Sequence, residues 1–193
     1  MKNIVLRLER PSDYRAVEKL TYEAFKNAKH SDGDEALLVH KLRGAPSFVS
    51  ELDFVAIVKD GEKVVGNIVY ARSKVVEPDD REWETLTFGP VSILPEYQRQ
   101  GIGSALIRHT LQLAREMSFR AVIIFGHKNY YPRFGFKEAS VFRITTAGGE
   151  NFPAFMALPL HEGALDGVHG KLICDPLYYS LEKEESEAFN AKL

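Results

Sequence analysis

Residues 89–106 place a short apolar strand, a proline-containing turn and a glycine-rich helix start in immediate succession. A helix N-terminus presents backbone N–H groups that have no partner inside the helix, and the aligned peptide dipoles add about half a positive charge there. Gly101 and Gly103 carry no side chain that would keep an anion away from those N–H groups. The stretch therefore predicts a strand–turn–helix unit whose helix start can bind phosphate oxygens, with Arg99 as a charged donor.

The residues around these glycines narrow the choice of phosphate ligand. A P-loop requires a lysine after its last glycine, whereas Gly103 is followed by Ser104 and Ala105. A dinucleotide fingerprint requires a small residue where Leu106 stands. Two glycines at a helix start also occur as plain structural turns. The pattern that does fit is Gln/Arg-x-x-Gly-x-Gly, present here as Gln98-Arg99-Gln100-Gly101-Ile102-Gly103 after the strand.

A second block follows at residues 121–136. It consists of an almost wholly apolar run, typical of a buried strand, and then His127-Lys128-Asn129-Tyr130-Tyr131-Pro132-Arg133-Phe134-Gly135-Phe136. The first block resembles the acetyl-CoA signature of the GNAT N-acetyltransferase superfamily. The second resembles its short helix that ends in a Gly-Phe turn, with Tyr131 four residues before the glycine. The chain also resembles a bacterial branch of predicted N-acetyltransferases with a Tyr-Tyr-x-Arg-Phe-Gly-Phe motif. This resemblance runs from about residue 4 to residue 178.

The resemblance implies an α/β (α+β) fold of the GNAT type: a central mixed, mostly antiparallel twisted sheet flanked by helices, with splayed fourth and fifth strands. From the residue patterns we expect strands at 4–8, 54–58, 63–70, 86–93 and 121–125. A first helix is expected from about residue 13 to residue 25, with Ser12 or Asp13 as its N-cap, and a second at 35–42. A third helix is expected after the glycines, with an apolar face that extends to Met117. Asp60-Gly61 predicts a hairpin turn and residues 75–82 a polar surface loop.

Pro90 lies inside the fourth expected strand, where it removes a ladder donor. An interruption of pairing there leaves backbone groups at Val91 and Ile93 open. The resemblance implies that the two amides of a pantetheine arm pair with them.

The chain length predicts a single domain over residues 1–193. The resemblance implies that it is an N-acetyltransferase domain with a core at about 4–140. Additional C-terminal strands are expected within about 141–180, at 155–160 and 170–174. The charged tail 181–193 predicts a solvated helix or a frayed end.

The composition excludes several classes of partner. A formal net charge of −2 with interleaved charges argues against nucleic-acid binding, which requires a basic patch. The absence of a long apolar span or signal pattern predicts a cytoplasmic protein without membrane association. The lone Cys174 excludes an internal disulfide and predicts a buried thiol. The oligomeric state stays open, a homodimer included.

The resemblance implies transfer of an acetyl group from acetyl-CoA, the cosubstrate, to a primary amine of a small molecule or protein, without a metal. Tyr131 is expected to act as general acid, with Tyr130 as fallback, because a tyrosine is protonated at neutral pH and a thiolate of pKa about 8.5 leaves more easily once protonated. Packing aromatics are the alternative. The implied cofactor-binding residues are Val91, Ser92, Ile93, Gln98, Arg99, Gln100, Gly101, Ile102, Gly103, Ser104 and Asn129.

No general base stands out, since Glu82, Glu84 and His127 each fit a surface or hydrogen-bonding residue better than a base, and we expect a relay of water. The loop at residues 29–33 is either part of the acceptor site or a solvated connector. A catalytically silent acyl-CoA-binding sensor or interaction module is the alternative function. A nucleotide-binding protein is a distant third, because the phosphate-binding lysine is missing.

Overall fold

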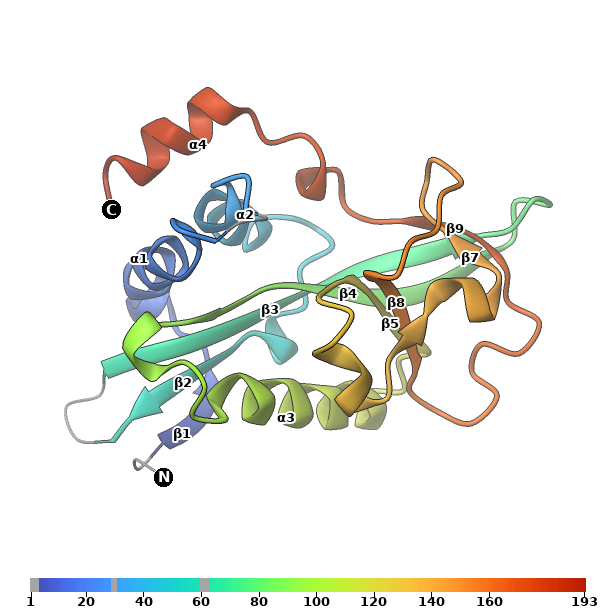
Figure 1. Ribbon diagram of the computed structural model, residues 1–193, viewed down its shortest axis with the longest axis horizontal. Coiled ribbons are helices and arrows are strands. Elements are labelled where there is room, and N and C mark those ends of the chain that lie inside the picture. Colours follow the sequence, from blue (N-terminus) through green and yellow to red (C-terminus); the bar gives the residue numbers. More distant parts are fainter. Residues whose placement is uncertain (1–3, 29–30, 60–62) are drawn as a thin grey trace. The chain divides into compact units, whose positions relative to one another are not determined.

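A computed structural model describes residues 4–28, 31–59 and 63–193 of the chain (Figure 1). Internal contacts divide the chain into two compact units. The first comprises Met1–Tyr70, Gly89–Thr110 and Pro176–Leu193, and the second comprises Ala71–Phe88 and Leu111–Asp175. Strands β3 (Lys63–Val76) and β4 (Glu82–Ile93) and helix α3 (Ile102–Glu116) contribute residues to both units. The expectation of one domain stays a prediction.

The sheet of the first unit follows the chain order. Strand β1 (Ile4–Leu8) pairs antiparallel with β2 (Phe54–Val58), and β2 pairs antiparallel with the first part of β3. The end of β4 completes the order β1-β2-β3-β4. These strands lie where the alternation and apolar runs predicted them. The predicted Asp60-Gly61 turn lies outside the described residues.

Helices lie on both faces of this sheet: α1 (Tyr14–Phe25) and α2 (Glu35–Leu42) on one, and the first half of α3 on the other (Figure 1). Asp13 is the N-cap residue of α1, but its carboxylate makes no capping hydrogen bond. It accepts hydrogen bonds from Arg7 Nη2 at 2.9 Å and from the Arg10 backbone N–H at 2.8 Å instead. The charged C-terminal run forms helix α4 (Lys183–Asn190). Of the two predictions for this run, a helix or a frayed end, the helix is the one found.

In the second unit β3 and β4 are followed in the strand order by β5 (Ala121–Phe125), β8 (Phe155–Pro159) and β6 (Lys137–Glu138). Strand β5 (Ala121–Phe125) pairs parallel with β4 at Leu86 and Val122, and antiparallel with β8 (Phe155–Pro159). Strand β9 (Gly170–Ile173) pairs antiparallel with β3. The sheet is thus mixed and mostly antiparallel, as predicted. The splaying of β4 from β5 beyond Gly89 stays a prediction.

Three expectations were wrong in detail. Residues 75, 76 and 82 are not loop, since β3 continues to Val76 and β4 begins at Glu82. Glu82 reads as loop because it lies on the exposed side of its strand, where it pairs with Lys74 at 2.6 Å. Val75 and Val76 read as loop because they directly precede the polar run 77–81. Two short strands, β6 (Lys137–Glu138) and β7 (Ile144–Thr145), were not predicted. Met117 follows the end of α3 and is exposed rather than packed.

Candidate active site

The start of α3 has the geometry that the glycines predicted. The single-turn helix at Pro95–Tyr97 ends at Gln98, and the chain then passes through left-handed φ values of 58° at Arg99 and 84° at Gly101. The Ala105 N–H donates to the Gly101 carbonyl at 2.9 Å, so the helical bonding begins there. The N–H groups of Ile102 and Gly103 consequently belong to the first turn, which has no internal acceptor for them.

Two glutamine side chains hold this turn in place. Gln98 Nε2 donates to the Ile93 carbonyl at 3.0 Å, and Gln100 Nε2 donates to the Glu96 carbonyl at 2.9 Å. Both residues are also among those expected to bind the cofactor, which stays a prediction. The Ile93 carbonyl, expected to be open, therefore already accepts one hydrogen bond.

The C-terminal end of β4 directly precedes this turn in the sequence. Ser92 is fully buried, and its hydroxyl has no hydrogen-bond partner among residues 4–28, 31–59 and 63–193. The Leu94 N–H donates to the Val65 carbonyl at 3.0 Å, which ties the strand end to β3. Val91 and Ile93 are half-buried. The backbone of this segment is thus held in extended form up to the turn.

In the second unit, the residues after β5 place Tyr131 in an aromatic environment. Its ring contacts Phe88 at 5.8 Å, Phe136 at 5.7 Å and Phe134 at 6.3 Å between centroids. Burial raises the pKa of the Tyr131 phenol above its ordinary value, and the neighbouring Tyr130 adds to the rise. No hydrogen-bond partner of the Tyr131 hydroxyl is found in the described part of the chain. The phenol therefore stays protonated well beyond neutral pH.

The other predicted site residues of this segment, Tyr130 and Asn129, have surroundings different from those of Tyr131. The Tyr130 ring faces the Arg133 guanidinium, 4.5 Å from the ring centroid, and packs edge-on against Phe134. Asn129 lines an open cavity of about 380 Å³ together with Lys128, Pro132 and Met156. The predicted cofactor-binding residues 91–104 thus lie in the first unit, and Asn129 and Tyr131 lie in the second.

Each candidate base already has a local partner. Glu82 pairs with Lys74, and Glu84 pairs with Arg72 at 2.8 Å; all four residues line a cavity of about 420 Å³ in the second unit. His127 Nδ1 accepts from the Asn129 backbone N–H at 3.3 Å. No carboxylate or imidazole among the three is thereby set apart as a base.

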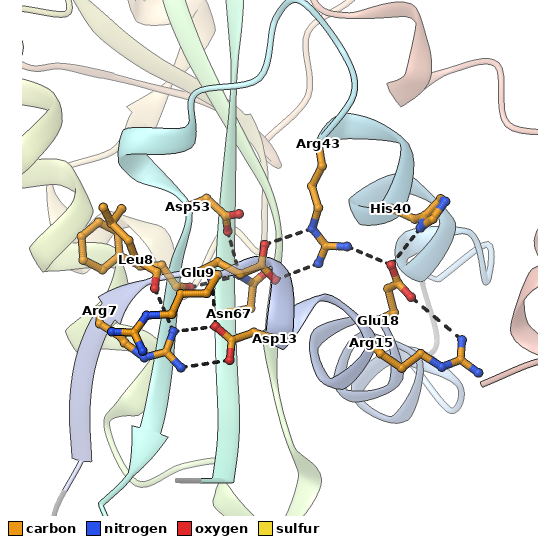
Figure 2. Close-up of polar contacts among 12 residues, drawn as sticks. Arg7, Leu8, Glu9, Asp13, Arg15, Glu18, His40, Arg43, Asp53 and Asn67 are labelled. Carbon is orange, nitrogen blue, oxygen red and sulfur yellow. Dashed lines mark hydrogen bonds and ion pairs between the residues drawn. The ribbon is translucent and has the colours of Figure 1, made fainter.

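A buried polar network in the first unit was missed from the sequence (Figure 2). Arg43 donates to Glu9 from Nε and Nη2, at 3.0 and 2.8 Å, and to Glu18 at 2.9 Å from Nη1. Asn67 Nδ2 donates to Asp53 at 3.0 Å. Burial raises the pKa of Asp53 to about 9, and a hydrogen bond with the Glu9 carboxyl adds to the rise. The sequence does show charged residues next to the strand ends, which could have indicated this network. Which of them pair, however, depends on the register between the strands.

Neither a membrane span nor a metal centre is found among the described residues. No helix there has the length and apolar character to cross a membrane. No group of three or more His, Cys, Asp or Glu side chains in the same residues is arranged to hold a metal ion.

The strand topology and the open helix start define the class of protein, an acyltransferase of the GNAT fold. The profile of the family "Acetyltransferase (GNAT) domain" matches residues 51–138. The chain is 32% identical over 148 residues to the uncharacterized N-acetyltransferase YjhQ of Escherichia coli, covering 77% of this chain and 72% of that protein. The chain therefore belongs to the GNAT family of N-acetyltransferases, as its sequence predicted.

Solved structures agree with this assignment. The E. coli N-acetyltransferase YhbS, solved in complex with CoA, superposes with a TM-score of 0.80 at 26% identity and covers 94% of this chain and 95% of its own. A GNAT family acetyltransferase from Brucella melitensis, solved in complex with acetyl-CoA, gives a TM-score of 0.71 at 27% identity, covering 92% of this chain and 99% of its own.

Proposed function

We propose that this protein transfers the acetyl group of acetyl-CoA to a primary amine of a small molecule or of a protein. The observation that carries the proposal is the start of α3, where Gly101 with a φ of 84° precedes a first turn of N–H donors. Pyrophosphate is the anionic group of CoA that suits such a helix start. The CoA and acetyl-CoA complexes of the two structural relatives support the same ligand.

The proposed acetyl-CoA site uses backbone more than side chains. The N–H groups of Ile102 and Gly103 face the pyrophosphate, and the exposed Arg99 guanidinium adds charge. The pantetheine amides pair with backbone groups at Val91 and Ile93. The remaining members of the proposed set are Ser92, Gln98, Gln100, Gly101, Ser104 and Asn129.

Tyr131 is the proposed general acid of the reaction. An alkylammonium of pKa about 10.4 first loses a proton, and the neutral amine attacks the thioester carbon. As the carbon–sulfur bond breaks, Tyr131 gives its phenolic proton to the sulfur, and the phenolate regains a proton that the attacking nitrogen releases. The net transfer is one amine proton to the thiol. We assign proton removal from the amine to a chain of water rather than to Glu82, Glu84 or His127.

Thiol release from acetyl-CoA, measured over a panel of small amines and peptides, tests the proposal. We expect turnover with at least one acceptor, and a loss of about 100-fold in kcat for Tyr131→Phe with CoA binding preserved in a thermal-shift assay. CoA binding without turnover on any amine would instead support an acyl-CoA-binding sensor. Substitution of Glu82, Glu84 or His127 should lower the rate only modestly. A loss of several orders of magnitude in rate at one of them would identify that residue, instead of a water chain, as the base. A homodimer and a cytoplasmic location stay predictions from the sequence.

A further inference from the structure

Three phenylalanines form an aromatic cluster in the second unit, at the C-terminal end of β5. Phe125 stacks on Phe155 with ring centroids 5.1 Å apart and on Phe152 at 6.0 Å, and interplanar angles of 22° and 25° make both pairs nearly parallel. Phe155 is fully buried, whereas Phe125 and Phe152 are 46% and 40% exposed. We call these three residues the aromatic platform. Its two outer rings present an apolar surface to solvent.

The platform is joined to the backbone that carries Tyr131. Phe125 directly precedes Gly126, against which the Tyr131 ring packs. The Gly126 N–H donates to the Ala154 carbonyl at 2.8 Å, and the Phe155 N–H donates to the Phe152 carbonyl at 2.9 Å. These two bonds fix the turn that bears Phe152 to the residue that supports Tyr131. The platform and the Tyr131 ring are therefore attached to, or packed against, one hydrogen-bonded stretch of backbone.

Platform and phenol lie on opposite sides of this strand end. The Tyr131 ring lies on the side of Gly126 that also faces the Ile124 side chain. Because successive strand residues point to opposite faces, the Phe125 side chain points the other way. Phe125 and the Gly126 that contacts Tyr131 are consecutive residues, so a short linker joins a ring on the platform to an amino group near the phenol.

We propose that the aromatic platform binds the acceptor, and that the acceptor is a small primary amine carrying an aromatic ring on a short linker. This inference rests on the proposed N-acetyltransferase function. The attacking nitrogen and the leaving sulfur are different substituents of one carbonyl carbon. A surface that holds the amine therefore belongs on a different side from the phenol that protonates the sulfur, as the platform does.

The chemistry of the platform favours the ring of the acceptor over its amino group as the bound part. An alkylammonium also binds to aromatic faces, but stabilisation of the cation there would oppose the deprotonation that attack requires. An aromatic ring on Phe125 and Phe152 gains stacking energy beyond the burial of its area, worth about fivefold to tenfold in affinity. A saturated ring of the same size buries apolar area without that gain.

The experiment compares 2-phenylethylamine with 2-cyclohexylethylamine, with each rate referred to the concentration of the neutral amine. We expect kcat/KM about fivefold to tenfold higher for the aromatic amine, although the saturated ring is the more hydrophobic one. Phe125→Leu and Phe152→Leu should each reduce this preference, mainly through KM, with unchanged CoA binding. Val141→Ala, which also trims an exposed apolar side chain of the second unit, is the control and should keep the preference.

Binding of the same two amines to the CoA-loaded protein, followed by NMR line broadening, separates failure of this proposal from failure of the proposed function. Equal binding of the two amines, or a preference that survives in both leucine variants, overturns the platform. Preferential binding of the aromatic amine that both leucine variants lose supports it, even if no amine is acetylated. Absence of turnover on every amine counts against the N-acetyltransferase activity alone.

Discussion

The Tyr131 ring occupies the space that a side chain at position 126 would need: a Cβ placed on Gly126 would overlap Cε2 and Cδ2 of that ring. Gly126 follows the last residue of β5, and Tyr131 begins the single-turn helix Tyr131–Phe134. The absence of a side chain at 126 thus permits the close approach of the ring to the strand end. The orientation of the proposed acid depends on one missing methyl group.

We therefore expect Gly126→Ala to displace the Tyr131 ring and lower kcat. Because a shift of about 1 Å in a catalytic group can cost about 100-fold, we expect a loss of 10- to 100-fold, with CoA binding little changed. Gly44→Ala is the control, since a Cβ there meets its nearest atom at an ordinary 3.6 Å. Equal activity of Gly126→Ala and the parent would show that the position of this ring does not limit the reaction.

The raised pKa of Tyr131 predicts the alkaline part of the pH–rate profile. The direction of the shift means that the phenol keeps its proton as pH rises through 10, the ordinary value of the group. The rate should rise with pH as the amine loses its proton and then level off, without a decline near pH 10. A descending limb near pH 10 that Tyr131→Phe abolishes would show that the phenol titrates normally.

Gly101 and Gly167 allow the proposed phosphate site to be tested apart from backbone strain. Both have positive φ, 84° and 76°, and a Cβ on either meets no atom within 4 Å. Alanine should therefore cost each variant about 1–2 kcal/mol of stability from the left-handed conformation alone. Only Gly101→Ala should weaken CoA binding, by about tenfold in isothermal titration, because relief of the strain moves the N–H groups of the first turn. Equal CoA affinities in the two variants would argue against this helix start as the binding site.

Local patterns predicted most elements because they depend on neighbouring residues only. The apolar run 121–125 is fully paired with β8, and α2 spans Glu35–Leu42 as expected. The aromatic platform was not foreseeable in this way, because Phe152 and Phe125 are distant in sequence and meet through the pairing of β5 with β8. A spacing rule predicts that a strand exists, whereas its partner and register depend on the whole fold.

The Glu9–Asp53 pair was missed for the same reason. Glu9 follows β1 and Asp53 precedes β2, and the Glu9 N–H donates to the Asp53 carbonyl at 2.9 Å as a continuation of their antiparallel pairing. Each carboxylate by itself reads as a solvated residue at a strand end. Only the register brings two acids together in a buried place.

Asp53 should make the folded state less stable as pH rises. In the native protein its carboxyl keeps a proton up to about pH 9, whereas in the unfolded chain it loses the proton near pH 4. Between these values the folded chain binds more protons than the unfolded chain. The free energy of unfolding therefore falls with rising pH, by up to about 1.4 kcal/mol per pH unit for this group, and this contribution is fully present only below about pH 4.

Asp53→Asn should remove that slope. The amide resembles the protonated carboxyl, since it can donate to Glu9 and accept from Asn67, but it does not titrate. Urea unfolding between pH 5 and 9 should show the variant gaining stability relative to the parent as pH rises. Asp79→Asn is the control, because Asp79 is exposed and its pKa is lowered by Arg81, so that its titration lies below this range. Parallel curves for parent and Asp53→Asn would contradict the assignment.

Arg43 should contribute far more stability than a surface cation. Its guanidinium is almost fully buried between Glu9 and Glu18, whose side chains are also buried, and lies 4.1 Å from the Tyr14 ring centroid. Arg43→Leu keeps apolar bulk but removes the cation that Glu9 and Glu18 share, and leaves Glu18 with the more exposed Arg15 at 4.0 Å and His40 at 2.8 Å. We therefore expect a loss of about 3–5 kcal/mol in urea unfolding at pH 7. Lys183→Ala, which removes the exposed partner of Glu187, should cost less than about 1 kcal/mol. Because protonation relieves unpaired acids, the deficit of Arg43→Leu should shrink toward pH 4, and a deficit independent of pH would assign the loss to packing instead.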